Sequence, residues 1–264
     1  MLNRLSPALL ALLAFSNLAF GQDKPARPKP EDTEAWKPVP PVVQPKPYKE
    51  TPAPAGAIIL FDGKNLDEWI NTRDKKPAEW IVKDGMLVVN KKTGNIETKR
   101  KFKDYQLHLE FMFPDNSDFK GQSRSNSGLF LASTGGGDAG YELQILDSYQ
   151  NETYVNGMAA SIYKQAIPLA NPSAKPGEWQ TYDVTWTAPR FKSDGSLESP
   201  ATVTVLFNGV LVQDRFPLKG ETVFIGQPKY KPYETAAIKL QSHGDASKPM
   251  SFKNIWIKET KGKQ

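Results

Sequence analysis

A short run with the alternation of a strand carries residue types suited to acid–base chemistry. Residues Tyr141–Asp147 read Tyr-Glu-Leu-Gln-Ile-Leu-Asp. Because side chains alternate between the faces of a strand, the apolar residues face a core, and Glu142 and Gln144 face the other way. Asp147 has the parity of the core set, so the strand must bulge or end before it. Glu142 and Asp147 are therefore candidate catalytic groups, although a solvated outer face would give the same pattern.

Two neighbouring features favour a binding cleft beside this run. Asn126-Ser127-Gly128 opens another strand-like segment, and a glycine inside a strand permits close approach of a backbone or a ligand. The polar, glycine-rich segment 133–138 is typical of a loop that borders a cleft. We therefore expect Asn126 to contribute to substrate binding.

The segment Ser161–Gln165 supplies two further candidates for a binding face. Tyr163 and Gln165 share one parity. A tyrosine ring has an apolar face and a polar hydroxyl, so Tyr163 could stack on a sugar. A tyrosine buried in the core is an equal alternative.

The chain has two histidines, His108 and His243. His108 occupies a polar position of an alternating strand, and we expect it to be exposed. His243 follows the apolar segment 238–241 and precedes a glycine, which places it at the rim of a sheet beside Gln241. Histidine titrates near neutral pH and serves as base, acid or metal ligand.

Short strand-like segments separated by turn signals fill the chain from residue 57 onward, and no stretch has a convincing helical period. This pattern predicts an all-β fold of two packed antiparallel sheets, with the first and last strands paired. The predicted strands are 57–61, 80–82, 86–89, 105–113, 127–133, 141–146, 179–186, 203–207, 210–216, 238–241 and 252–258.

The first 55 residues differ in composition from the rest. Residues 1–21 have Arg4, a short apolar run and small residues before Gln22, which is typical of a secretory signal peptide, with an uncleaved anchor as the alternative. Residues 22–55 are rich in proline, lysine and glutamate, which predicts a disordered, extended linker. The folded domain is then 56–260. We expect an exported protein (periplasmic, cell-surface or secreted) with no later transmembrane segment.

The composition excludes some classes of function. The chain has no cysteine, so it has no disulfide, thiolate metal site or thiol nucleophile. Its net charge is +5, with lysines and acids interspersed and no basic run flanked by aromatic residues. Nucleic-acid binding needs a concentrated basic surface, so we expect no nucleic-acid partner.

Together these segments resemble the 3-keto-disaccharide hydrolase domain family over residues 57–259. The landmarks are Leu60-Phe61-Asp62-Gly63 with Leu66 and Trp69, Trp80 with Asp84-Gly85, Asn126-Ser127-Gly128, Tyr141–Asp147, Ile162-Tyr163, Pro168-Leu169 with Asn171, Gly177-Glu178-Trp179, Asn208-Gly209, Gln241-Ser242-His243-Gly244 and Phe252–Ile257. The resemblance implies a concanavalin-type jelly-roll sandwich and an exported enzyme that cleaves 3-keto-glycosides. Ser242 and Lys253 stand where the family often has Asp and Arg.

A ketone at carbon 3 of a sugar acidifies the hydrogen on carbon 2, so a base could remove it and the glycosidic oxygen could leave. Such a site needs a base, a stabiliser of the enolate and an acid. We expect His243 or Glu142 as the base. The residues expected to hold the sugar or its oxyanion are Asn126, Gln144, Tyr163, Gln165, Gln241 and Lys253. No cofactor is identified, but a divalent metal could stabilise the enolate, with Glu142, Asp147 and His243 as ligands.

Two other functions fit the same residues. Jelly-roll glucanases carry Glu-x-Asp-x-x-Glu on one strand, whereas this chain has Glu142-x-Gln144-x-x-Asp147. The amide at the central position disfavours a conventional retaining glycosidase. A lectin-like module that only binds carbohydrate is the second alternative, since a fold does not determine a function.

Overall fold

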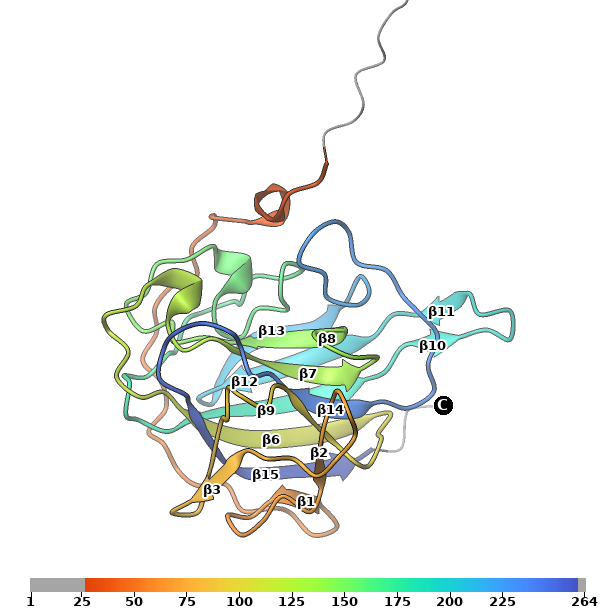
Figure 1. Cartoon of the computed structure of the whole chain (residues 1–264). Coiled ribbons are helices and arrows are strands. Elements are labelled where there is room, and N and C mark those ends of the chain that lie inside the picture. Colours follow the sequence, from red (N-terminus) through yellow and green to blue (C-terminus); the bar gives the residue numbers. More distant parts are fainter. Residues whose placement is uncertain (1–26, 261–264) are drawn as a thin grey trace, which may run out of the picture.

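The computed structural model describes residues 27–260, which form a sandwich of two antiparallel sheets (Figure 1). The predicted all-β jelly-roll class is confirmed. Helical structure in the described residues is limited to three short 3-10 turns, η1 (Pro30–Thr33), η2 (Gly121–Ser123) and η3 (Val155–Gly157). Within these residues no helix is long and apolar enough to cross a membrane.

The two sheets differ in size. The large, eight-stranded sheet contains β1 (Ile58–Phe61), β3 (Ile81–Lys83), β4 (Met86–Val88), β6 (Tyr105–Met112), β9 (Gln180–Thr187), β12 (Thr202–Phe207), β13 (Val210–Pro217) and β15 (Ser251–Glu259). The small, five-stranded sheet has the order β2 (Trp69–Asn71), β5 (Ile96–Thr98), β14 (Ala237–Leu240), β7 (Ser127–Ser133) and β8 (Gly140–Ile145). A separate hairpin joins β10 (Arg190–Phe191) and β11 (Leu197–Ser199).

The predicted strands correspond to strands of the structure within a residue or two. The first and last strands of the domain pair, with Ile58 opposite Ile257. The short strands β2, β5, β10 and β11 were not predicted. They have two or three residues each, which is too short for an alternation to be recognised.

Two buried tyrosines of the large sheet fasten the strands of the small sheet in place. Tyr182 donates a hydrogen bond of 2.8 Å to the carbonyl of Gln144 on β8, and Tyr105 donates to the carbonyl of Leu131 on β7. Both rings are fully buried in the core. A buried hydroxyl needs a partner, so these two bonds fix the position of β7 and β8 relative to the large sheet. The outer side chains of β7 and β8 are positioned by the same contacts.

The proline-rich segment differs from the disordered linker that the sequence predicts. Among its described residues, Ala35 accepts a backbone hydrogen bond from Val155, and Pro41 accepts one from Asn171. Trp36 packs edge-on against the Tyr154 ring. Ala35 and Val43 also donate their N–H groups, to the Asn156 side chain and to the Asn171 carbonyl. Proline lacks a donor but keeps its carbonyl, so loops of the domain hold the segment through its carbonyls and its remaining N–H groups. Figure 1 shows it along one side of the sandwich. The predicted signal peptide, 1–21, lies outside the described residues.

His108 is buried, so the prediction that it is exposed is wrong. Its Nδ1 lies 2.7 Å from Asp183 Oδ1, and its Nε2 lies 3.3 Å from Glu110 Oε1. Trp256 stacks on the ring, and the N-terminal segment reaches the same cluster, where the Tyr48 hydroxyl donates to Glu110. A polar position in an alternating strand is buried here because this segment covers that face of the large sheet.

Candidate functional site

A pocket on the outer face of the small sheet gathers most of the predicted site residues. Its volume is about 340 Å³. The lining residues are Asn126, Asp138, Glu142, Gln144, Tyr163, Thr222, Phe224, Gln241 and His243.

A row of side chains across the small sheet forms the floor beside this pocket. Glu97, Lys239, Phe130 and Glu142 are consecutive partners on β5, β14, β7 and β8. All four are buried, but Phe130 does not belong to the core between the sheets. The strand alternation therefore places two buried carboxyl side chains and a buried lysine on the outer face, as predicted for Glu142.

Glu142 is held in a dry position against β7. It is 5% exposed, and a Cβ at Gly128 would lie 2.3 Å from its Oε1. The glycine in this strand thus makes room for a neighbouring side chain. Burial, reinforced by the negative charge of Asp138 and opposed by Lys239, raises the pKa of Glu142 to about 8. The carboxyl is therefore mostly protonated at neutral pH and suited to donate a proton.

Lys239 fixes the glycine-rich loop 134–139 that borders the pocket. Its ammonium donates to the carbonyls of Gly135, Gly137 and Ala139 at 3.2, 2.9 and 2.7 Å. The ammonium also lies 4.6 Å from the centre of the Phe130 ring. The three N–H donors of the ammonium are thus all satisfied, and Lys239 holds the loop that forms the wall of the pocket. Its positive charge also lowers the pKa of Glu142, against the effect of burial.

Side-chain amides line a second side of the pocket. The Gln144 amide lies 3.2 Å from the side-chain oxygens of Asn126 and of Gln122. Gln241 Oε1 is buried and has no hydrogen-bond partner among the described residues. An orphaned buried acceptor is costly, and a sugar hydroxyl entering the pocket would satisfy it.

His243 is oriented by a buried carboxylate. Its Nδ1 lies 2.9 Å from Asp245 Oδ2, and its side chain is 37% exposed, whereas that of Asp245 is 3% exposed. Asp245 is in turn held by Lys91, with 2.9 Å between Nζ and Oδ1. Contact of Nδ1 with a carboxylate favours the proton on that nitrogen, which leaves Nε2 as the basic atom.

Two aromatic side chains complete the lining. Phe224 is 58% exposed at the mouth of the pocket. The Tyr163 hydroxyl lies 2.7 Å from that of Tyr154, and Lys164 lies 4.6 Å from the centre of the Phe224 ring. An exposed ring beside polar groups is a platform on which the apolar face of a sugar can stack.

Three predicted site residues lie elsewhere. Asp147 is buried against Arg124, with 2.9 Å between Oδ2 and Nε. Gln165 does not line the pocket; it accepts from the Lys219 amide and donates to the Gly220 carbonyl. Lys253 lies on the large sheet, 3.6 Å from Glu110. These three side chains make structural contacts elsewhere, so the structure does not bring them into the pocket with the other predicted site residues.

The set predicted as metal ligands does not assemble. Glu142 and His243 line the pocket, but Asp147 faces Arg124. Across residues 27–260 no three His, Asp or Glu side chains come together in a way that would hold a metal ion.

Four residues of the site were not among the predicted site residues. Asp138, Thr222 and Phe224 come from loops, and Asp245 orients His243. Two of them had a usable signal: Asp138 ends the glycine-rich segment that was expected to border a cleft, and an acid two residues after a histidine in a turn, as Asp245 is, can reach its ring. Phe224 lies far from β8 in sequence and has no signal in its own segment.

Comparison with known proteins agrees with the fold. Residues 56–258 match the family model of the 3-keto-alpha-glucoside-1,2-lyase-like domain. A crystal structure of a proposed glycosyl hydrolase from Parabacteroides distasonis ATCC 8503 is 50% identical, with a TM-score of 0.75, and the match covers 87% of this chain and 96% of that one. Two further proposed glycosyl hydrolases of that organism share the fold at 20% and 22% identity, with TM-scores of 0.57 and 0.53. Their matches cover 78% and 77% of this chain and 95% and 99% of theirs. No curated protein matches the chain. The chain is thus similar to carbohydrate-active jelly-roll proteins.

Proposed function

Because the chain belongs to the 3-keto-alpha-glucoside-1,2-lyase-like domain family, we propose that it cleaves 3-keto-glycosides by elimination in the pocket on the small sheet. The observation that carries this proposal is the pairing in one pocket of a protonated carboxyl, Glu142, with a histidine oriented by a buried aspartate, His243. Elimination needs an acid and a base of opposite protonation at the same pH.

His243 is the proposed base. Its Nε2 takes the hydrogen from carbon 2 of the sugar, which the neighbouring ketone has acidified. Asp245 stabilises the imidazolium that forms, because its carboxylate lies 2.9 Å from Nδ1. The electron pair of the broken C–H bond passes into the enolate of the 3-ketone.

Glu142 is the proposed acid. The enolate returns its electrons to form the carbon 1–carbon 2 double bond, the bond from carbon 1 to the glycosidic oxygen breaks, and Glu142 gives that oxygen its proton. Asn126 and Gln144 supply amide groups for the sugar and the developing negative charge. Water then adds across the double bond, so the net products are those of hydrolysis.

The proposal is tested by following aglycone release from a 3-keto-glucoside by the purified chain and by variants. We expect His243→Ala and Glu142→Gln each to lower kcat by about 10²–10⁴-fold. The exposed Glu178→Gln variant serves as a matched control that removes a carboxylate outside the pocket lining. Full activity in both pocket variants would remove the assignment.

Binding without turnover is the outcome that favours a lectin-like module. The same pocket, with the exposed Phe224 ring and the unpartnered Gln241 oxygen, would hold a neutral sugar. Saturable binding of an unoxidised glucoside, with no release from the 3-keto form, would replace the enzymatic proposal.

We also propose that the chain is exported, from the apolar run after Arg4. Amino-terminal sequencing of protein recovered from the producing cells tests this. A mature end near Gln22 supports export, whereas an intact Met1 in the cytoplasmic fraction contradicts it.

A further inference from the structure

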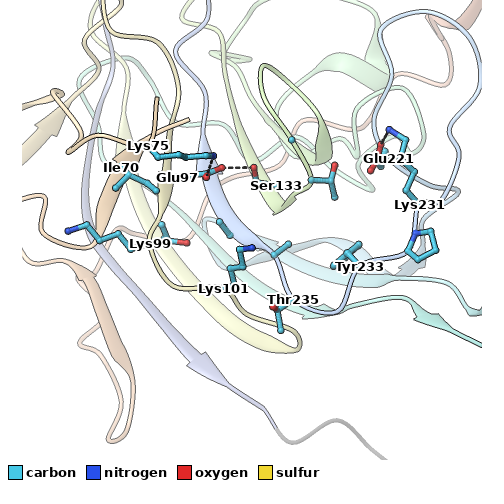
Figure 2. Close-up of a pocket in the computed structure, with 16 residues that line it drawn as sticks. Ile70, Lys75, Glu97, Lys99, Lys101, Ser133, Glu221, Lys231, Tyr233 and Thr235 are labelled. Atoms are coloured by element: carbon cyan, nitrogen blue, oxygen red, sulfur yellow. Dashed lines mark hydrogen bonds and ion pairs between the residues drawn. The ribbon is translucent and has the colours of Figure 1, made fainter. Parts of the chain in front are cut away.

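A second cavity, larger than the first pocket, has the start of the glycine-rich loop 134–139 in its lining (Figure 2). Its volume is about 520 Å³. The rest of the lining comes mainly from β2, β5 and the segment 231–237. The polar side chains of the lining include Lys99, Lys101, Thr134, Glu221 and Lys231.

The cavity has an excess of positive charge. Four lysines and two glutamates line it. Lys75 pairs with Glu97, and Lys231 lies 3.0 Å from Glu221. Within residues 27–260, Lys99 and Lys101 have no carboxylate within 4.0 Å. Figure 2 shows Lys101 reaching into the space between the two ion pairs, whereas the ammonium of Lys99 points away from Lys101. An anion in the cavity would neutralise this excess.

The cavity also contains buried polar atoms that lack partners. Glu221 is 6% exposed, and its Oε1 has no hydrogen-bond partner in the described residues. The hydroxyl of Thr134 is buried and unpartnered in the same way. Such groups are costly to leave unsatisfied, so the cavity is built to receive a ligand with several polar atoms.

The excess of positive charge and the unpartnered polar atoms together indicate what kind of ligand fits the cavity. Glu221 Oε1 is a carboxylate oxygen and needs a donor, which a simple inorganic anion such as sulfate does not offer. A neutral sugar offers hydroxyl donors but leaves the lysines without a counter-charge. We propose that this cavity binds a sugar unit bearing an anionic group, a carboxylate or a sulfate, with the anion on Lys101 and a hydroxyl donated to Glu221.

The cavity adjoins the first pocket. Glu221 lines the cavity, and the next residue, Thr222, lines the first pocket, where its hydroxyl accepts from the Glu142 amide. Thr134 and Asp138 stand at opposite ends of one loop and face the two spaces separately. A glycan could therefore occupy both. The proposal concerns binding alone and stands whether or not the Glu142 pocket is catalytic.

The test is titration of the full chain, by calorimetry at low salt, with glucuronate, glucose 6-sulfate, glucose and inorganic sulfate. We expect one of the two anionic sugars to bind at least about 10-fold more tightly than glucose and sulfate, because only it meets both requirements. The tighter of the two identifies the anionic group. Equal affinity for sulfate alone would mean a non-specific anion site and overturn the proposal.

Variants locate the ligand. The variant Lys101→Gln should weaken binding by about 10-fold or more, and Thr134→Val by about 3-fold without a change of charge. The control is Lys64→Gln, which removes a lysine whose side chain is 78% exposed outside the cavity. Equal weakening in the control would reduce the effect to net charge. Loss of binding in His243→Ala alone would place the sugar in the first pocket. Either result overturns the proposal.

Discussion

The carboxyl of Glu142 rests against Gly128, where a Cβ would lie 2.3 Å from its Oε1. Because the backbone of Gly128 is not in the left-handed region, alanine fits the strand there and its methyl group must displace the carboxyl. We expect Gly128→Ala to fold and to lose at least about 10-fold in kcat, since small misplacements of a catalytic group are costly. Gly136→Ala, whose methyl would meet nothing within 4 Å, is the control. Equal activity of the two variants would contradict the role of this contact.

The rate of aglycone release should fall as the pH rises through about 8. Burial raises the pKa of Glu142 to about 8, so its proton is present below that pH and lost above it. An acid catalyst is active in the protonated form, which gives the sign of the change. A profile of kcat against pH measures it. A rate that climbs steadily from pH 7 to 9 would mean that Glu142 acts as a base or takes no part.

Asp245→Asn should lower kcat by at least about 10-fold and change KM much less. The carboxylate stabilises the imidazolium of His243 only while the proton is held, so its loss acts on the chemical step. The variant must be checked for intact folding, because Lys91 and Ser247 also bind this carboxylate. Asp194→Asn, at an exposed hairpin turn, controls for the loss of an acid. A rise in KM at constant kcat would assign Asp245 to binding.

The buried His108–Glu110 cluster should make stability depend on pH at both ends. Burial alone would lower the pKa of His108, but hydrogen bonds to Asp183 and Glu110 raise it from 6.5 to about 8. Burial alone would raise the pKa of Glu110, but hydrogen bonds from His108, Tyr48 and Asn254 lower it from 4.5 to about 2.

The directions of these two pKa shifts define a pH range in which the domain is most stable. The contribution of His108 is complete below pH 6.5 and is lost as the pH rises through about 8. That of Glu110 is complete above pH 4.5 and is lost as the pH falls towards about 2. We expect Tm to be highest between about pH 4.5 and 6.5, and His108→Phe to remove the fall towards pH 8. An unchanged alkaline fall in that variant would assign the effect to other groups.

Tyr48→Phe should lower the free energy of unfolding by about 1.5–3 kcal/mol, the range for a hydrogen bond to a charged group. The Tyr48 hydroxyl lies 2.6 Å from Glu110 Oε2, so the variant leaves that carboxylate with one donor fewer. Denaturant unfolding measures the change. Tyr149→Phe is the control, since its hydroxyl has no hydrogen bond among the described residues. An equal loss in both variants would show that residues 46–51 do not stabilise the domain through this contact.

Alternation along single strands was readable from the sequence, and it placed Glu142 and Gln144 on the outer face of the small sheet. Gly128 was also identified as a point of close approach, although a neighbouring side chain, not a backbone or a ligand, is what approaches. Both inferences needed only the two-residue period of a strand and the small size of glycine.

The errors arose where distant segments meet. Lys253 was placed in the site, but its strand belongs to the other sheet, and a strand carries no mark of its sheet. His108 was expected in solvent because nothing in its own strand shows that residues 46–51 cover it. Asp147 was assigned to catalysis from its position after Glu142 and Gln144, because nothing in its own segment shows that it pairs with Arg124, 23 residues away. Each depends on packing that local periodicity does not encode.

The fate of the hydrogen on carbon 2 tests the central claim most directly. A 3-keto-glucoside carrying deuterium at carbon 2 is incubated with the purified chain in ordinary water, and the released sugar is examined by mass spectrometry. Elimination through His243 predicts aglycone release with loss of the deuterium and a slower rate than for the unlabelled substrate. Release with the deuterium retained would contradict the account and point to direct hydrolysis at carbon 1.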